Sequence, residues 1–145
     1  MPVPRFNQYG LLPPGIHEAS MEEMSQGLGF TPRRQELIGT GLRFVCGELR
    51  AVGVTEIVLD GSFVTWKPSP GDIDGYVVTK LGTTVASLIK DRRRLWFARY
   101  QVDLFAAFED LTGHGSVADW EEYFGHTREE PPQAKGLIKL NLGRR

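Results

Sequence analysis

Two short segments hold the residue types that could do chemistry, Gly61-Ser62 and Asp72-Ile73-Asp74. A glycine-serine pair that follows an apolar run can offer backbone N–H groups to a phosphate. If Asp72 and Asp74 lie on a strand, the period of two places both carboxylates on one face, with Cα atoms about 6–7 Å apart. Two acids at that spacing can converge on a hard divalent cation. Together the two segments predict a site for a nucleoside triphosphate and a metal ion.

A third acid, Asp103, stands alone between Val102 and Leu104 in an apolar segment. A buried carboxylate is costly without a partner, so this position requires a metal ion, a cation or hydrogen-bond donors. If its strand lies beside the one that holds Asp74, the acids can surround one or two Mg²⁺ ions. The alternative is a structural salt bridge from Asp103 to Arg99 or to another arginine that faces the core.

Simpler interpretations of the other residues stay open. Asp72 and Asp74 also fit a solvated turn after Pro70-Gly71, where aspartate is common. The basic run Arg92-Arg93-Arg94 could bind a triphosphate or RNA, and it equally fits the wet face of a helix. Lys135 is either a phosphate contact or a flanking charge on an edge strand.

The composition is that of one globular domain. With 145 residues, the chain is long enough for a real core and too short for two ordinary domains. Apolar residues make up 41% and charged residues 24%, and the formal net charge of −1 gives no whole-protein attraction to nucleic acid or anionic membrane. Cys46 is the single cysteine, which excludes an internal disulfide. We expect a cytoplasmic protein, because no apolar run approaches ~18 residues and the N-terminus lacks a signal-peptide core.

The positions of proline and glycine and the periodicity of apolar residues predict how the chain is divided into segments. Residues 1–15 form a proline- and glycine-rich arm, and residues 16–145 form a single domain. Capping residues and apolar spacing predict helices that begin at residues 20, 31, 63, 83 or 84, and 116. The second of these runs to residue 53 and the third to residue 67. Alternation and apolar runs predict strands at 55–60, 72–79, 101–108 and 137–142. The expected fold is α+β, with a central sheet of about four strands and flanking helices.

The order of these motifs resembles a known superfamily. An apolar strand, Gly-Ser, nine further residues, Asp-x-Asp and a later Asp between apolar residues are the pattern of nucleotidyltransferases with the polymerase-β-type palm. The chain is most similar to a small bacterial branch of predicted nucleotidyltransferases. That branch carries segments like Leu12–Glu18 (LPPGIHE), Leu59–Thr65 (LDGSFVT), Pro70–Gly75 (PGDIDG) and Lys135–Ile138 (KGLI). The resemblance implies a minimal nucleotidyltransferase fold with a mixed sheet.

The resemblance also implies roles for individual residues. Gly61 and Ser62 would contact the β- and γ-phosphates of an NTP. Asp72 and Asp74 would bridge two Mg²⁺ ions, while Asp103 would bind the second ion and favour deprotonation of the acceptor. This agrees with the chemistry of two-metal sites, where ions about 3.5–4 Å apart stabilise the attacking and leaving oxygens of an in-line displacement.

Three features depart from the superfamily pattern. Many relatives carry a basic residue three positions after the serine; here Thr65 stands there and Lys67 is the nearest cation, so both are assigned to the nucleotide site. The residue after the second aspartate is usually apolar, but here it is Gly75. The chain also has no sizeable second domain to bind a base or an acceptor.

The function expected from these residues is transfer of NMP from a Mg²⁺-bound NTP to a hydroxyl on protein, RNA or a small molecule. Two alternatives stay open. One is a catalytically degenerate nucleotidyltransferase-fold protein that binds a protein partner, for example as half of a toxin–antitoxin or phage-defence pair. The other is a metal-dependent phosphohydrolase with water as acceptor. A domain of this size could also complete its acceptor site as a homodimer, and no membrane partner is expected.

Overall fold

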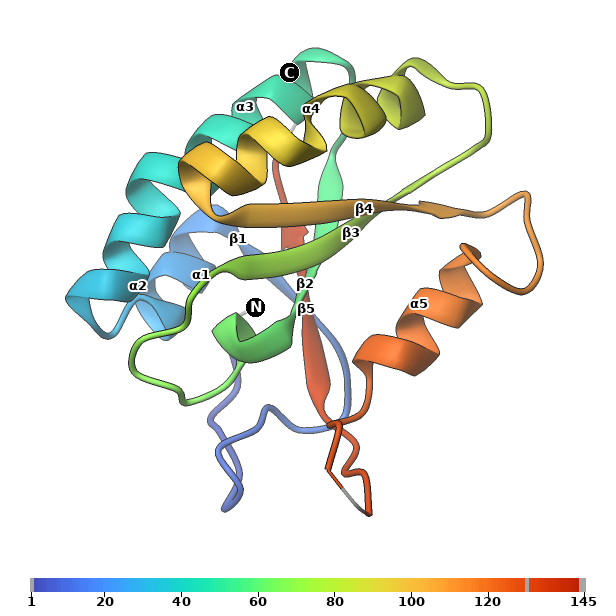
Figure 1. The fold of residues 1–145 in the computed structure, drawn as a ribbon. Coiled ribbons are helices and arrows are strands. Elements are labelled where there is room, and N and C mark those ends of the chain that lie inside the picture. Colours follow the sequence, from blue (N-terminus) through green and yellow to red (C-terminus); the bar gives the residue numbers. More distant parts are fainter. Residues whose placement is uncertain (1, 130, 144–145) are drawn as a thin grey trace.

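The computed structural model describes residues 2–129 and 131–143, which fold around one mixed five-stranded sheet of order β1-β5-β2-β3-β4 (Figure 1). The strands are β1 (Gly15–Ser20), β2 (Glu56–Asp60), β3 (Ile73–Thr79), β4 (Val102–Phe108) and β5 (Gly136–Asn141). β1 runs parallel to β5 and β3 parallel to β4, whereas β2 is antiparallel to both of its neighbours. The predicted α+β fold with a mixed sheet and flanking helices is therefore confirmed.

The sheet has one strand more than the sequence predicted. β1 has six residues, of which only Ala19 is buried, so its sequence lacks a clear alternation of apolar and polar residues. It is held by parallel pairing with β5 along its whole length, from Gly15 opposite Gly136 to Ser20 opposite Asn141. A partner distant in sequence thus defines this strand.

The helical elements are α1 (Met21–Leu28), α2 (Pro32–Glu36), the π-helical η1 (Leu37–Leu42), α3 (Arg43–Ala51), the 3₁₀ turn η2 (Gly61–Val64), α4 (Thr84–Tyr100) and α5 (Val117–Phe124). Ser20 and Glu23 form the predicted capping box of α1. Thr31, Thr83 and Ser116 cap the helices that follow them, as their sequence positions indicated. In the described part of the chain, none of these helices is long and apolar enough to cross a membrane.

The segment from residue 31 to residue 53 differs from the single amphipathic helix that was predicted. Its middle, η1, is a π-helix between α2 and α3. A side chain at Gly41 would place its Cβ 2.7 Å from the backbone oxygen of Tyr100, at the end of α4. The glycine therefore lets two helices approach closely, at the place where the regular helix is interrupted. The predicted helix over 63–67 is likewise shorter, the 3₁₀ turn η2.

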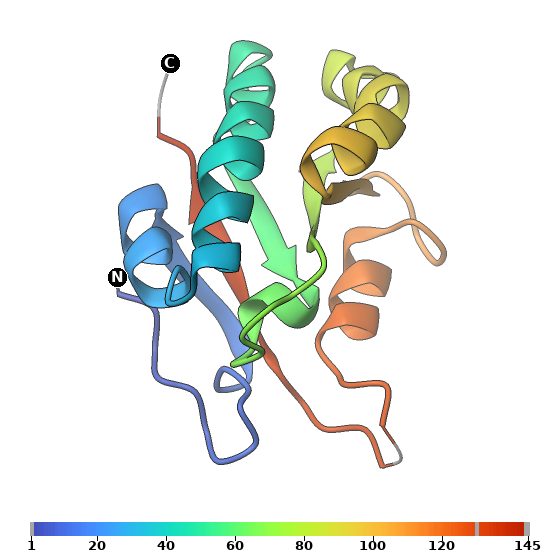
Figure 2. The same ribbon diagram turned by 60° about the vertical axis from the view of Figure 1, so that its left-hand side comes forward.

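The two faces of the sheet are covered unequally (Figures 1 and 2). Helices α1, α3 and α4 share one large hydrophobic core with side chains such as Ile57, Val77 and Leu140. On the other face, a smaller cluster forms where Phe124 of α5 packs near Tyr76. The larger core therefore lies on the first face, and α5 packs on the second.

The N-terminal arm is joined to the end of the sheet. Leu12 is completely buried in the main core, and its carbonyl accepts a hydrogen bond from the N–H of Gly136. Leu11 forms an isolated bridge with Thr65, just after η2. The described part of the arm thus contacts the segment that the sequence assigns to the nucleotide; Met1 lies outside the described residues.

Candidate functional site

A row of carboxylates crosses three neighbouring strands. The strand register places Asp60 opposite Asp74, and Asp74 opposite Asp103. Residues directly opposite each other project from the same face of a sheet, and neighbouring strands lie about 4.7–4.9 Å apart. Because Tyr76 and Phe105 follow two residues later on β3 and β4, the row shares the face that α5 covers.

Asp72 lies one residue before β3 and extends the row. Its charge acts on the carboxyl group of Asp74. Burial, followed by the charges of Asp72 and Asp103, raises the pKa of Asp74 to about 7. The three acids that the sequence singled out therefore lie close enough for the charges of Asp72 and Asp103 to raise the pKa of Asp74.

Asp60 is a fourth acid, which the sequence analysis missed. It is completely buried, and within the described residues neither of its carboxylate oxygens has a hydrogen-bond partner. Burial, and then the charge of Asp74, raises the pKa of Asp60 to about 8, while Lys135 acts in the opposite direction. The only sequence signal was an acid at the end of an apolar strand, immediately before Gly61.

The glycine of Gly61-Ser62 is required by its surroundings. Gly61 has a φ of 74°, and a Cβ at this position would collide with Oδ2 of Asp74. The carbonyl of Ser62 then accepts hydrogen bonds from Oγ1 and N–H of Thr65, at 2.6 and 3.2 Å. The turn therefore passes directly beside the carboxylate row and is braced by Thr65.

A cleft of about 890 Å³ opens over this row, between the sheet and α5. It is lined by most of the predicted site residues, namely Gly61, Ser62, Thr65, Asp74 and Asp103, and by Lys135. The opposite wall carries aromatic residues, such as Trp120 and Tyr123, and charged residues of both signs, Asp119, Arg128 and Glu129, together with His126. Asp72 and Lys67 are not among the lining residues, and Lys67 is exposed.

Lys135 is a cation whose charge acts on the buried acids Asp60 and Asp74. It precedes β5, and its N–H donates to the carbonyl of Gly125. Burial lowers the pKa of Lys135, whereas the charges of Asp60 and Asp74 raise it. A half-buried ammonium group beside a carboxylate row can contact an anionic ligand in the cleft.

Asp103 takes part in an ion pair as well as in the row. Nε of Arg93, on α4, donates to Oδ1 of Asp103 at 3.0 Å. The same guanidinium lies 3.8 Å above the ring of Phe105. Asp103 thus has an ion-pair partner, but this partner is the exposed Arg93 and not Arg99 or an arginine that faces the core. The ion pair leaves Asp103 opposite Asp74.

The aromatic wall is built by stacking. The Trp120 ring lies 4.7 Å from Phe105 and 5.3 Å from Phe124, and Phe124 stacks on Tyr76 at 6.4 Å. Nε1 of Trp120 and the hydroxyl of Tyr76 are buried without a hydrogen-bond partner in the described chain. Unpaired polar atoms therefore accompany the acids on this face of the sheet.

The donor chemistry of the row fits magnesium. Its side chains are all carboxylates, the hard oxygen ligands that Mg²⁺ prefers. The two carboxylate oxygens of Asp60 have no hydrogen-bond partner within the described residues. Within residues 2–129 and 131–143, no group of three or more His, Cys, Asp or Glu side chains is arranged as a ready metal site. Asp72, Asp74 and Asp103, the acids that the sequence assigned to metal ions, therefore do not form such a group in the described residues.

Residues 4–141 match a protein family described as a family of unknown function (DUF6932). The chain belongs to this family. The match includes the whole carboxylate row, the Gly61-Ser62 turn, α5 and Lys135. No curated protein and no solved structure gives a significant match to the chain.

Proposed function

We propose that this protein is a Mg²⁺-dependent nucleotidyltransferase that moves NMP from an NTP to a hydroxyl group on protein, RNA or a small molecule. The observation that carries the proposal is the contact between the Gly61 turn and Asp74. The turn, which is suited to phosphate, and the carboxylates of Asp74 and Asp103, which are suited to a divalent cation, both line one cleft. A metal-bound triphosphate needs both.

The proposed nucleotide site consists of Gly61, Ser62 and Lys135, which would contact the terminal phosphates. Thr65 braces this turn through its bonds to the Ser62 carbonyl. Lys67 was expected to be the cation here, but its side chain is exposed outside the cleft, and Lys135 is better placed for that part.

The proposed metal site consists of Asp72, Asp74 and Asp103, whose oxygens would hold two Mg²⁺ ions. When bound, magnesium neutralises phosphate charge and aligns the attacking and leaving oxygens. The acceptor oxygen forms a bond to the α-phosphorus as the bond to pyrophosphate breaks. Asp103, which lines the cleft at the end of the row, would favour loss of the hydroxyl proton. Most of the rate enhancement would come from positioning and charge stabilisation.

One observation favours a second candidate, a degenerate nucleotidyltransferase-fold protein that binds another protein, as in a toxin–antitoxin or phage-defence pair. Arg93 already occupies Oδ1 of Asp103, so the third acid has a partner without a metal ion. Such a protein would keep the fold and the cleft while losing turnover. For both candidate functions we propose a cytoplasmic location.

Thermal unfolding with each Mg²⁺-bound NTP tests the first candidate. At a ligand concentration 100 times Kd, binding stabilises the folded state by about 2.7 kcal/mol, and Asp72→Ala or Asp74→Ala should abolish the rise in Tm. Incubation of α-labelled NTPs with cell lysate then identifies the acceptor, since the label moves onto protein or RNA. Phosphate release without an acceptor would indicate a hydrolase. Silence with all four NTPs, together with a co-purifying protein whose binding survives Asp74→Ala, would support the second candidate.

A further inference from the structure

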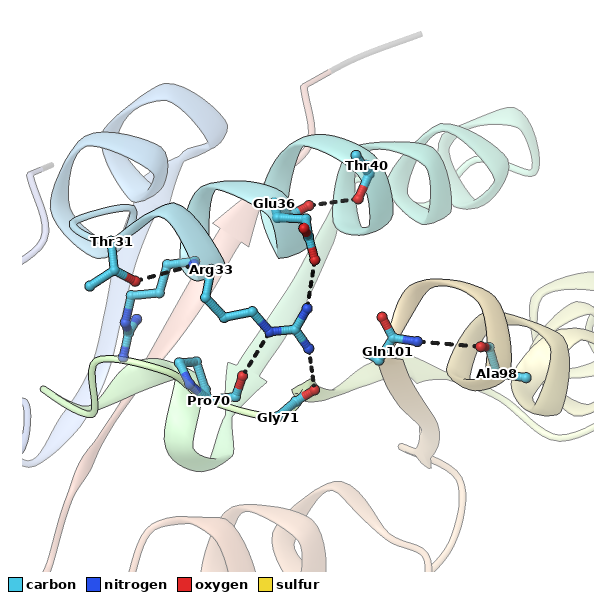
Figure 3. Close-up of polar contacts among 9 residues, drawn as sticks. Thr31, Arg33, Glu36, Thr40, Pro70, Gly71, Ala98 and Gln101 are labelled. Carbon is cyan, nitrogen blue, oxygen red and sulfur yellow. Dashed lines mark hydrogen bonds and ion pairs between the residues drawn. The ribbon is translucent and has the colours of Figure 1, made fainter.

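Residues 61–72 connect β2 to β3. Thr31, the N-cap of α2, and Arg33 in α2 donate three hydrogen bonds to backbone carbonyls of this connection. Oγ1 of Thr31 donates to the carbonyl of Pro68 at 2.7 Å. Arg33 donates to the carbonyls of Pro70 and Gly71, at 3.3 and 2.8 Å (Figure 3). Arg34 holds the earlier part of the same connection, which includes the Gly61-Ser62 turn.

Arg34 uses every donor of its guanidinium on backbone carbonyls. Nε binds the carbonyl of Lys67 at 2.9 Å, and Nη1 binds those of Leu28 and Phe63 at 3.1 and 2.6 Å. Nη2 binds the carbonyls of Ser62, at 3.4 Å, and Thr65. An arginine has five N–H donors, so this set is complete. Four of the five acceptors belong to the connection between the strands.

The charge of Arg34 is buried without an opposite charge. The side chain is completely inaccessible, and among the ion pairs of the described chain none involves Arg34. The rings of Phe30 and Phe63 lie 4.3 and 5.1 Å from its guanidinium carbon, so carbonyl dipoles and ring faces replace a carboxylate. A buried ion without a counter-ion is costly, and five hydrogen bonds offset that cost.

This arrangement has two consequences for the turn. In a trans peptide the C=O and N–H point in opposite directions, so carbonyls drawn toward Arg34 turn the N–H groups of Phe63 and Val64 away from it. The positive charge of Arg34 is also fixed beside the turn but outside the cleft, because Gly61 and Ser62 line the cleft and Arg34 does not. Both effects suit an anion that lies against Ser62.

We propose that Arg34 is the positioning residue that fixes the conformation of residues 61–67 and supplies positive potential beside them, so that this turn can bind the terminal phosphates of an NTP. The role of the turn in NTP binding rests on the proposed function. The role of Arg34 in fixing the conformation of the turn rests on its hydrogen bonds alone. Arg33 has a smaller part, since its side chain is 29% exposed and also pairs with Glu36 at 2.7 Å (Figure 3).

Lysine is the decisive substitution at this position. Arg34→Lys keeps the positive charge but offers three donors from one atom, which cannot reach carbonyls arranged around a planar fork. Arg34→Met removes both charge and donors. Arg33→Met is the matched control from the adjacent residue, and Leu49→Ala lowers stability at a core position of α3, outside the connection.

Hydrogen exchange on peptides that cover residues 61–67, with calorimetric titration of the Mg²⁺-bound NTP that stabilises the wild type most, gives the test. Arg34→Lys and Arg34→Met should speed exchange in these peptides and weaken NTP binding by about tenfold or more. Arg33→Met should weaken binding less than about threefold. Leu49→Ala should lower Tm while leaving Kd unchanged. Wild-type exchange and affinity in Arg34→Lys, or equal weakening by Leu49→Ala, would overturn the proposal.

Two measurements on the wild type keep the test decisive if the Arg34 variants do not fold. The Nε–H resonance of Arg34 should exchange slowly with solvent and shift when the Mg²⁺-bound NTP is added. A rapidly exchanging resonance, or one that ignores a nucleotide that does bind, contradicts the inference. If no NTP binds the wild type, the proposed function fails together with the ligand part of the inference, while exchange at residues 61–67 still decides whether Arg34 fixes the turn.

Discussion

The two faces of the sheet treat buried polar groups in opposite ways. On the face covered by α1, α3 and α4, the buried arginine Arg34 has all five donors satisfied. On the face covered by α5, the carboxylate of Asp60, the hydroxyl of Tyr76 and the indole N–H of Trp120 are buried without partners in the described chain. Unpaired buried groups each cost about 1–3 kcal/mol, so one face is organised for stability and the other carries a cost that a ligand could relieve.

The largest effect that would sharpen this comparison is expected at Asp74. Asp74→Ala removes the acid that contacts the turn and adjoins Asp72 and Asp103, so transfer activity should fall by about two to three orders of magnitude or more. Its apo stability should hold or rise, because a repelling carboxyl is gone. Label transfer and thermal unfolding measure the two quantities. Asp91→Ala, at an exposed acid of α4, is the control and should change neither.

A core substitution on the first face should have the reverse profile. Leu49→Ala removes a completely buried side chain from the large core and should lower the free energy of unfolding by about 2–5 kcal/mol. Affinity for Mg²⁺-bound NTP should stay the same. Urea unfolding and calorimetric titration provide the two numbers, and a loss of affinity comparable to that of Asp74→Ala would break the division between the faces.

The pH dependence of stability should come from the second face. The pKa of Asp60 is raised from 3.8 to about 8, so the folded state holds this proton more tightly than the unfolded state does. Its contribution is therefore complete below about pH 4 and is lost as the pH rises through 8. Asp60→Asn cannot ionise, so without magnesium its stability relative to the wild type should increase between pH 5 and pH 9. Urea unfolding at several pH values measures this, and a constant difference would mean that Asp60 is not held protonated.

The smallest effect is expected on the outer surface of the helical face. Arg92 and Glu48 approach to 3.8 Å, with 46% and 23% of their side chains exposed. Such a pair contributes about 0–1 kcal/mol, so Arg92→Gln should change the free energy of unfolding by less than about 0.5 kcal/mol. Urea unfolding is again the measurement. A larger loss would mean that the stability of the helical face depends on a polar surface pair, which contradicts the comparison between the two faces.

Local chemistry explains what could be read from the sequence. Ser20, Thr31, Thr83 and Ser116 were found as helix caps, because a cap depends on residues within one turn. The strands at Asp60, Asp74 and Asp103 followed from apolar runs. β1 and the π-helical η1 did not, since the first depends on pairing with β5 and the second on contact with α4.

Asp60 and Arg34 were missed as site residues for the same physical reason, because their roles depend on contacts between distant segments. Asp60 joins the row only through the register of β2 on β3, which a sequence pattern does not specify. Arg34 looks like an ordinary exposed helix residue, because arginine is rarely buried without a charged partner. Its five acceptors come from residues 28 and 62–67, which only the fold brings together. Thr65 was noted for lacking a basic side chain, yet its carbonyl is where the guanidinium of Arg34 arrives.

The most direct test of the central claim is a crystal structure with Mn²⁺ and a non-hydrolysable NTP, with the metal located by its anomalous signal. We predict metal between the carboxylates of Asp72 and Asp74, with the terminal phosphates against Gly61 and Ser62. Metal and nucleotide bound elsewhere, or an empty cleft at saturating nucleotide, would contradict the account.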